Sequence, residues 1–554
     1  MARPWADSPE TGKGLGEMIQ NGQHNIGHIC TRQQCDLGRA DKVALRWITS
    51  RKEPVIFSFR NLDQESNKWA NLLGHLGVER GEVFAILLPK APEVFFAILG
   101  ALKAGVIVNT LFSNLGDDAL RDRLEDARAR VVFTRRAFLK RLSGARASLP
   151  SLRVLLLDGD EPGSEGLLSY KRLREEVSDA YEVALTTPTT PSVVHYTSGS
   201  TGRPKGVLHV HGGIAYQART AREILDLRDD DIYWCTADQA WVTGTTYGVI
   251  APWSLGVTQV QFGGGFSAGD WCQVLQEEKV SVWYTAPTAL RMLMRESSQF
   301  YQAFDFRALR HVCSVGEPLN PEVITWARRV FGRTVHDTWF QTETGGIMIA
   351  NRPQQEVKPG SMGTPVAGIE AAVIRDDGSE AAVGEHGHLC IKAGWPSMFV
   401  SYLNADSVYQ SKFKNGYYFS GDKAYRDAEG YFWFLGRSDD VINTAGHLVS
   451  PFEVESALLE IDGVVESGVI GAPDDVLFEK VVAFVCLRDA GAASDELKLR
   501  LRLHVANRVS TVATPQEIIF VSDIPKNNSG KIMRRLLKAR YTGENVGDTS
   551  TLEG

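Results

Sequence analysis

The stretch at residues 83–109, VFAILLPKAPEVFFAILGALKAGVIVN, decides the fold class. It contains a short apolar run at 83–88, a helix-length segment at 92–103 and a second apolar run at 106–109. Short buried strands that alternate with helices are typical of an α/β protein with a largely parallel sheet. Because Lys103 interrupts the most apolar part of the chain, 94–108, and this part is short, we expect no membrane-spanning helix.

The alternation continues along the chain. A charged amphipathic segment at 117–129 precedes apolar runs at 130–134 and 153–157, which we expect to be strands. Residues 158–190 are acidic and then rich in Thr and Pro, so we predict a surface connection there. A further strand is predicted at 192–197.

Beyond residue 434 the sequence pattern changes to that of a small α+β unit. Helices are predicted at 452–460 and 496–510, and strands at 464–470, 480–487 and 517–521. A chain of 554 residues exceeds the size at which one hydrophobic core keeps growing. We therefore predict a large N-terminal domain, residues 1–436, and a C-terminal domain, residues 440–554, with the boundary between them at 437–439.

Composition narrows the class of protein. Hydrophobic residues make up 43% and charged residues 23%, which is ordinary for a globular protein. A net charge of −7 argues against a nucleic-acid-binding surface over the whole molecule. None of the seven cysteines forms a CxxC pair and the first residues contain no apolar signal segment, so we expect reduced thiols and a cytoplasmic location.

The strongest local motif is YTSGSTGRPKG at residues 196–206. Glycines let backbone N–H groups converge on an anion, and hydroxyls and a lysine add further donors for phosphate oxygens. The spacing is not that of a Walker A loop, and the alternative is a surface turn of small residues. Because a strand leads into the motif, we predict a phosphate-binding loop formed by Thr197, Ser198, Gly199, Ser200, Thr201, Gly202 and Lys205.

With this motif the sequence resembles the adenylate-forming family, which comprises acyl-CoA synthetases, adenylation domains and firefly-type luciferases. The resemblance runs from about residue 25 to 540, and within the family the chain is most similar to acetyl-CoA synthetases. The segments that carry it are 195–211, 232–253 (IYWCTADQAWVTGTTYGVIAPW), 311–323 (HVCSVGEPLNPEV), 335–346 (VHDTWFQTETGG) and 525–538.

The resemblance implies a ligase with ATP, acetate and CoA as substrates and Mg²⁺ as cofactor. It would form acetyl-CoA, AMP and pyrophosphate through an acetyl-adenylate, and its small C-terminal domain would move between the two half-reactions. Two alternatives stay open: an enzyme for propionate or another short acid, and a non-catalytic nucleotide-binding homologue. Loading of a carrier-protein thiol is less favoured because no carrier domain is found in this chain.

The resemblance also assigns roles around the nucleotide. Thr342 is expected to contact the α-phosphate, and Glu343 to bind Mg²⁺, a hard cation that prefers oxygen ligands. Asp422, assisted by Arg437, is expected to bind the ribose hydroxyls. The adenine pocket is expected to be lined by Gly316, Glu317, Pro318, Asp337 and Thr338.

Lys531, in PKNNSGKIMRR at 525–535, is the expected catalytic lysine of adenylation. Negative charge builds up when a carboxylate attacks the α-phosphate, and a positioned ammonium stabilises that charge. The alternative is a solvated start of a C-terminal helix. A protein acyltransferase and a deacylase are possible partners, because acylation of Lys531 would remove its charge.

The remaining expectations concern the hinge, CoA and the acid. Asp439 is the expected hinge residue, and Ala445 and Gly446 are expected to face the CoA channel. Family members commonly read Ser-Gly-x-Arg where this chain has Ala-Gly-His-Leu at 445–448, which puts nucleotide affinity in doubt.

The acid pocket is expected to be small and apolar. Acetyl-CoA synthetases usually carry a tryptophan where Phe340 stands, so propionate is a possible side substrate. Ordinary core packing is the alternative role of these side chains. The pairs at 209/211 and 386/388 are histidines without a matching cluster of ligands, so no further metal site is predicted. The expected pocket residues are Trp241, Val242, Thr243, Val315 and Phe340.

Overall fold

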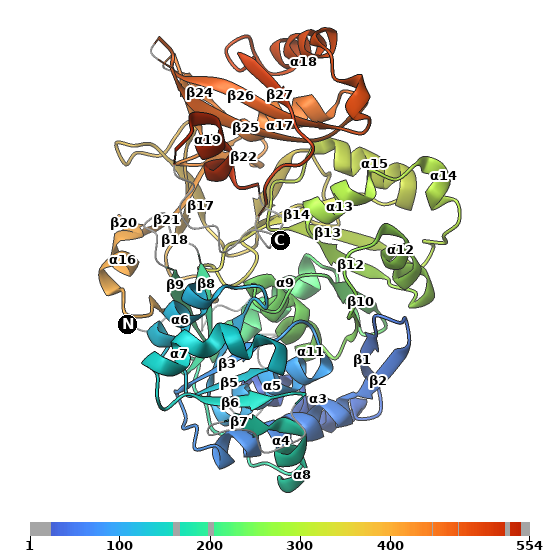
Figure 1. The fold of residues 1–554 in the computed structure, drawn as a ribbon, viewed down its shortest axis with the longest axis vertical. Coiled ribbons are helices and arrows are strands. Elements are labelled where there is room, and N and C mark those ends of the chain that lie inside the picture. The colour runs from blue at the N-terminus through green and yellow to red at the C-terminus, as the bar shows by residue number, and fades with distance from the viewer. Residues whose placement is uncertain are drawn as a thin grey trace.

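The structure is a computed structural model of the chain that describes residues 24–158, 167–197, 204–445, 447–474, 476–526 and 532–544. Within these ranges the strands form three sheets, and the third lies at the top of Figure 1 in orange and red. None of the described helices is long and apolar enough to cross a membrane. The predicted site residues that fall outside the described ranges are Ser198, Gly199, Ser200, Thr201, Gly202, Gly446 and Lys531.

The first sheet is mostly parallel and contains the strands predicted from the alternating apolar runs. Its order is β19-β9-β8-β4-β3-β5-β6-β7, in which only β19–β9 and β9–β8 are antiparallel pairs. The predicted α/β class is confirmed. The strands are β3 (Val83–Leu87), β4 (Ile107–Leu111), β5 (Val131–Thr134), β6 (Arg153–Leu156), β7 (Leu167–Ser169), β8 (Pro191–Thr197), β9 (Lys205–Val210) and β19 (Ser401–Tyr402).

One prediction was partly wrong. Residues 158–190 were expected to be a plain surface connection, yet this segment adds β7 to the sheet edge and then forms helix α8 (Tyr170–Glu176). The Tyr170 ring is buried and stacks 4.8 Å from the Trp69 ring. The burial of this aromatic side chain orders a segment whose average composition is polar.

The second sheet joins a parallel half to an antiparallel half. Its order is β17-β18-β21-β22-β16-β15-β14-β13-β12-β10-β11-β1-β2, with β20 beside β21, and the strands from β14 to β1 run parallel. The parallel strands are β1 (Val43–Ile48), β10 (Ile232–Cys235), β11 (Thr258–Phe262), β12 (Val282–Thr285), β13 (His311–Val315) and β14 (Val335–Trp339). The others are β2 (Pro54–Ser58), β15 (Ile349–Ala350), β16 (Ser361–Pro365), β17 (Ala371–Ile374), β18 (Gly387–Lys392), β20 (Phe413–Lys414), β21 (Tyr417–Arg426) and β22 (Phe432–Arg437).

Helices fill the space around these two sheets. The apolar helix α5, predicted at 92–103, packs against α4 and α2 in one core that also takes in residues of β3 and β5. Ser58 caps α4 through a hydrogen bond from the Asn61 N–H, which fixes where that helix begins. The helices of this part of the chain are α2 (Ile26–Cys30), α3 (Arg32–Gln34), α4 (Phe59–His75), α5 (Pro92–Ala104), α6 (Asp117–Asp126), α7 (Ser143–Ser148), α9 (Ile214–Glu223), α10 (Val242–Thr245), α11 (Ala251–Ser254), α12 (Ala268–Glu277), α13 (Pro287–Leu293), α14 (Ser298–Tyr301), α15 (Pro321–Phe331) and α16 (Asp406–Ser411).

The C-terminal part of the chain forms the third sheet, of order β24-β23-β26-β25 with β27 beside β26. Each helix and strand predicted between 452 and 521 is found within a few residues of its expected bounds. No strand was predicted at 442–449, where β23 and β24 pair as a short antiparallel hairpin. The elements are β23 (Ile442–Thr444), β24 (His447–Val449), α17 (Pro451–Leu459), β25 (Val464–Asp474), β26 (Phe478–Leu487), α18 (Asp495–Arg508), β27 (Glu517–Phe520) and α19 (Arg534–Thr542).

Candidate active site

The predicted phosphate loop connects two paired strands. Thr197, the last residue of β8, is paired with Lys205, the first residue of β9. Residues 198–203 of the loop are outside the described part of the chain. The two ends of the motif therefore lie side by side near the edge of the first sheet, where β9 is followed by β19.

The segment after β14 carries Thr342 and Glu343, and it is fixed by its neighbours. The Thr342 carbonyl oxygen is 2.7 Å from Nε2 of His209, a buried side chain of β9. Burial lowers the pKa of His209 to about 4, so the ring is neutral at pH 7 and donates from Nε2 to this carbonyl. Two further donors, Nε1 of Trp395 and Oγ of Ser397, both bind the carbonyl oxygen of Thr344.

Glu343 and Lys205 meet around a tyrosine that the sequence did not single out. Oη of Tyr402 in β19 donates to Oε1 of Glu343 at 2.8 Å. Nζ of Lys205 lies 5.9 Å from the centre of the same ring. Burial, and then the charge of Glu343, raise the pKa of Tyr402 far above its usual range, so the phenol keeps its proton. Nothing local in the sequence marks Tyr402, because β19 is a strand of two residues.

Asp422 is a buried carboxylate with three donors. Its Oδ1 accepts from Nη1 of Arg437 at 2.9 Å, and its Oδ2 accepts from Nε1 of Trp339 and Nε2 of Gln341, both at 3.0 Å. Asp422 and Arg437, both expected at the ribose, form this ion pair across β21 and β22. Trp339 and Gln341 were missed, although their every-second-residue spacing after Asp337 was a usable signal.

Glu317 lines a small cavity and is fixed by two donors. Its Oε2 accepts from Oγ1 of Thr288 at 2.8 Å and from Nη2 of Arg291 at 2.7 Å. The cavity has a volume of about 50 Å³. Residues from 291–320 and from 434–534 line it, among them Glu317, Pro318, Arg437, Ile532 and Arg534.

The side chains of Asp337 and Thr338 differ in their hydrogen-bond partners. Thr338 Oγ1 donates to the Ser314 carbonyl oxygen at 2.8 Å and is 2.7 Å from the Tyr284 hydroxyl oxygen. Oδ1 of Asp337 is buried and has no hydrogen-bond partner among the described residues. Burial raises the pKa of Asp337 well above its usual range. An orphaned buried acceptor is costly, so it marks a place where a ligand can donate a hydrogen bond.

Lys412 adds a cation that sequence reasoning also missed. It follows α16, and its carbonyl oxygen accepts from the Phe419 N–H of β21 at 2.8 Å. Burial lowers the pKa of Lys412, while the charge of Glu343 raises it. The nearby charges of Lys205 and Arg437 lower this pKa further, so Lys412 shares the electrostatic environment of Glu343.

The five predicted acid-pocket residues form two groups. Val315 and Phe340 belong to one apolar cluster, in which the Tyr247 ring lies 5.4 Å from the Phe340 ring. Trp241 packs against Phe112 at 5.0 Å between ring centres. Val242 and Thr243 follow Trp241 as buried residues of α10.

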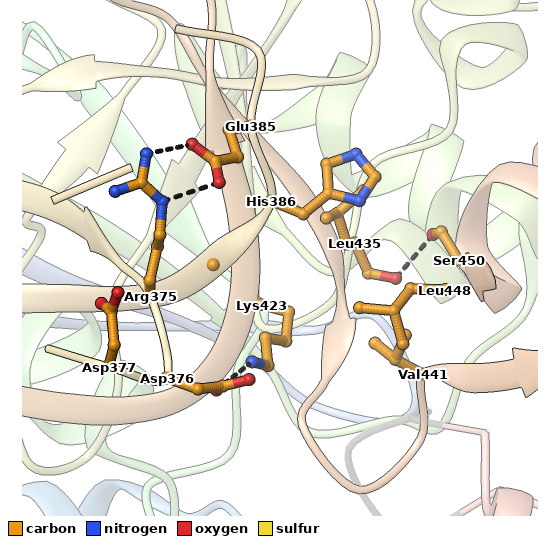
Figure 2. Close-up of a pocket in the computed structure, with 11 residues that line it drawn as sticks. Arg375, Asp376, Asp377, Glu385, His386, Lys423, Leu435, Val441, Leu448 and Ser450 are labelled. Atoms are coloured by element: carbon orange, nitrogen blue, oxygen red, sulfur yellow. Dashed lines mark hydrogen bonds and ion pairs between the residues drawn. The ribbon is translucent and has the colours of Figure 1, made fainter. Parts of the chain in front are cut away.

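The predicted hinge residue Asp439 and the predicted CoA-channel residue Ala445 lie at the start of the C-terminal part of the chain. Asp439 is exposed, and Ala445, at φ +50°, donates its N–H to the Leu477 carbonyl oxygen at 2.8 Å. Leu448 of β24, half exposed, lines a second cavity of about 330 Å³. Figure 2 shows the Arg375–Glu385 ion pair and Lys423 in this cavity, and no predicted site residue lines it.

The residues present fit a nucleotide-borne magnesium ion. Among the described residues there is no group of three or more His, Cys, Asp or Glu side chains that could hold a metal ion. Glu343 offers one carboxylate whose Oε1 accepts from Tyr402, which leaves Oε2 for a cation, beside a loop predicted to bind phosphates. Mg²⁺ typically takes one or two carboxylates, substrate phosphates and water, which matches this donor set.

The fold and this site define the chain as a member of the AMP-binding enzyme family. The model for the AMP-binding enzyme matches residues 32–403, and the model for the AMP-binding enzyme C-terminal domain matches residues 453–531. The chain is 44% identical to the acetyl-coenzyme A synthetase of Bacillus subtilis over 535 residues, covering 96% of this chain and 93% of that protein. It is 36% identical to the acetyl-coenzyme A synthetase of Methanothrix thermoacetophila, covering 99% of this chain and 88% of that protein.

Solved structures agree with this membership. The anthranilate CoA ligase AuaEII in complex with anthranoyl-AMP superposes with a TM-score of 0.86 at 29% identity, covering 94% of this chain and 98% of that one. A benzoate CoA ligase from Burkholderia xenovorans LB400 superposes with a TM-score of 0.83 at 28% identity, covering 93% of this chain and 99% of that one. The predicted family and fold class are therefore confirmed.

Proposed function

We propose that this chain is an AMP-forming acetyl-CoA synthetase, which converts ATP, acetate and CoA into acetyl-CoA, AMP and pyrophosphate. The similarity to the acetyl-coenzyme A synthetase of Bacillus subtilis over nearly the whole chain carries this proposal. The contacts around Glu343 and Asp422 support it, because they form a polar site suited to a nucleotide.

In the first half-reaction an acetate oxygen attacks the α-phosphorus of ATP, and the bond to pyrophosphate breaks. Thr342 would contact the α-phosphate, Lys205 and the loop at 197–202 would hold the other phosphates, and Asp422 would accept from the ribose hydroxyls. Glu343 would bind Mg²⁺, which neutralises phosphate charge when bound. These groups stabilise the charge that develops in the transition state.

The adenine would lie between the Gly316–Pro318 turn and Asp337. The orphaned Oδ1 of Asp337 suits the exocyclic amino group of adenine, a hydrogen-bond donor.

Lys531 is the proposed catalytic lysine of adenylation. Ile532, which follows it, lines the same cavity as Glu317 and Arg437, and this supports a role at the nucleotide. We expect Lys531→Ala to abolish acetate-dependent ATP–pyrophosphate exchange yet to spare thioester formation from supplied acetyl-adenylate, because the thiol attack needs no such cation. Equal loss of both half-reactions would contradict the assignment.

Acylation of Lys531 by a protein acyltransferase, reversed by a deacylase, is a proposed form of regulation. It would remove the positive charge and stop adenylation. Mass spectrometry of cell-derived protein combined with activity assays tests this, and fully acylated yet active enzyme would refute it.

The second half-reaction needs the thiol of CoA to attack the acetyl carbon and displace AMP. We propose that residues 1–436 and 440–554 are the two domains, and that they rotate about the hinge at 437–439, with Asp439 at its centre. The rotation would bring Ala445 and Gly446 to face the CoA channel. Such gating also excludes water from the reactive anhydride.

Acetate is the proposed acid, and propionate is the second candidate. Phe340 packs on Tyr247 and would close the end of a pocket that also takes in Trp241, Val242, Thr243 and Val315. One methylene in an apolar pocket changes the rate only about 10- to 200-fold. A free-thiol state of all seven cysteines accords with the cytoplasmic location that we propose.

The test is ATP–pyrophosphate exchange with a panel of acids from formate to butyrate, followed by CoA-dependent turnover. We expect the highest kcat/KM with acetate. No exchange with any short acid would favour the non-catalytic nucleotide-binding homologue, and a maximum at propionate would change the assigned substrate.

A further inference from the structure

The geometry points to Tyr402 as a positioning residue for Glu343, and this inference rests on the proposed function. We propose that the Tyr402 hydroxyl holds one oxygen of the Glu343 carboxylate, so that the carboxylate meets the magnesium ion through its other oxygen. Tyr402 acts through Glu343 and is not itself a ligand of the ion.

Tyr402 can do this because its backbone is fixed on both sides. In β19 it is paired with Val207 of β9, the Val400 N–H donates to the Leu208 carbonyl oxygen at 2.9 Å, and the Leu403 N–H donates to the Gly206 carbonyl oxygen at 2.8 Å. The side chain is 1% exposed, and its ring lies 5.1 Å from the Phe399 ring. A tyrosine has two side-chain torsions, so a fixed backbone and a packed ring determine where its hydroxyl lies.

The same short segment holds Glu343 at two points. The Phe399 N–H donates to the Glu343 carbonyl oxygen at 3.1 Å, and Oη of Tyr402 donates to Glu343 Oε1 at 2.8 Å. Main chain and side chain of Glu343 are therefore both bound by residues 399–402. A phenol has one proton to give, so it occupies Oε1 and leaves Oε2 as the oxygen available to a cation.

Tyr402 also places that carboxylate relative to the phosphate loop. Nζ of Lys205, at the end of the predicted loop, lies 5.9 Å from the centre of the Tyr402 ring. An ammonium at this distance from an aromatic face is attracted to it. One side chain thus connects the carboxylate that would bind the ion with a lysine that would bind the phosphates.

The test separates the hydroxyl from the ring. Tyr402→Phe removes the hydrogen bond and keeps the ring beneath Lys205, whereas Tyr402→Leu removes both. Binding of Mn²⁺, as a substitute for Mg²⁺, is measured by electron paramagnetic resonance in the presence of a non-hydrolysable ATP analogue. Removal of a group that orients a metal ligand typically weakens metal affinity about 10- to 100-fold.

For Tyr402→Phe we expect this loss of Mn²⁺ affinity, together with a higher Mg²⁺ concentration for half-maximal exchange. For Tyr402→Leu we expect a raised KM for ATP in addition. Tyr301→Phe is the matched control, because its buried hydroxyl donates to the Leu293 carbonyl oxygen away from the site. Unchanged Mn²⁺ affinity in Tyr402→Phe, or an equal loss in Tyr301→Phe, would overturn the proposal.

A double-mutant cycle guards against a variant that merely folds badly. In Glu343→Gln the charge is gone, so adding Tyr402→Phe should weaken Mn²⁺ binding little further. Fully additive losses would show that the hydroxyl acts elsewhere. If the wild type lacks acetate-dependent exchange but the Mn²⁺ measurements come out as expected, the proposed function fails while the role of Tyr402 stands.

Discussion

Hydrogen bonds fix the orientation of single side chains at the candidate active site, and Asp422 is the clearest case. Asp422 accepts from Trp339, Gln341 and Arg437 before any ligand is considered. A carboxylate can accept about four hydrogen bonds, so it keeps capacity for a sugar hydroxyl. Under the proposed function, the charge of Asp422 would therefore serve both to fix the site and to bind the nucleotide.

We predict that Asp422→Asn weakens ATP binding about 10- to 100-fold, because the amide NH₂ would face N–H donors and leave buried groups unsatisfied. Calorimetric titration with a non-hydrolysable ATP analogue measures this. Asp427→Asn is the control, since Asp427 directly follows β21 and pairs with Lys358, which is not a predicted site residue. Equal affinity of Asp422→Asn and the wild type would argue against a ribose role.

Phe478 is strained and exposed. It has φ +71°, a left-handed conformation that bulky residues rarely adopt, and its side chain is 70% exposed. We predict that Phe478→Gly stabilises the protein by about 1 kcal/mol, since glycine adopts this conformation without a steric penalty. The midpoint of urea unfolding should rise. Val476→Gly is the control. Val476 is 88% exposed and does not have a left-handed backbone, so glycine there should lower the urea midpoint.

At the scale of elements, the site depends on the segment that joins β14 to β15. Gly345 has φ +67°, and a Cβ there would lie 2.4 Å from the Ser397 carbonyl oxygen. This close approach lets Trp395 and Ser397 reach the Thr344 carbonyl and so fixes Thr342 and Glu343. The positions of Thr342 and Glu343 thus depend on Gly345, which follows them by three and two residues.

We predict that Gly345→Ala lowers the rate of adenylation about 100-fold, because a shift of about 1 Å in the segment displaces Thr342 and Glu343. Single-turnover kinetics with acetate and ATP measure this rate. Gly368→Ala is the matched control: Gly368 has φ +79° but no atom near an added Cβ. If both variants lose the same activity, backbone strain alone is responsible and the close contact is unimportant.

At the scale of the whole molecule, a buried histidine that directly follows β9 holds the N-terminal helix α2. Nδ1 of His211 accepts from the Ile26 N–H at 3.0 Å. Burial, and then the charges of Arg80 and His24, lower the pKa of His211 to about 3. The unfolded chain therefore binds a proton that the folded protein does not, at pH values between about 3 and 6.5.

It follows that the contribution of His211 to stability is fully present above about pH 6.5 and is lost as the pH falls toward 3. We predict that in His211→Asn the free energy of unfolding changes less with pH. The slope should fall by up to about 1.4 kcal/mol per pH unit in this window. Thermal unfolding midpoints of both proteins at pH 7.5 and 5.5 measure the difference. Parallel declines in the two proteins would show that His211 is not a source of acid sensitivity.

The sequence by itself determined the family, the α/β class and most elements, because these depend on local periodicity and on motifs that are contiguous in the chain. The runs at 83–88 and 92–103 and the C-terminal elements needed no distant partner to be recognised. The untested roles of Lys531 and Asp439 also come from contiguous motifs, and they stay predictions.

Only the tertiary structure decided which residues share one place. Tyr402 lies 59 positions from Glu343 in the chain, and Asp422 lies 81 from Gln341, so no local pattern could pair them. The hairpin at 442–449 and the ordered turn of α8 were missed for the same reason: long-range strand pairing and the burial of Tyr170 outweigh a polar local composition. Hydrogen bonds between distant segments, rather than the motifs themselves, set the geometry of the candidate active site.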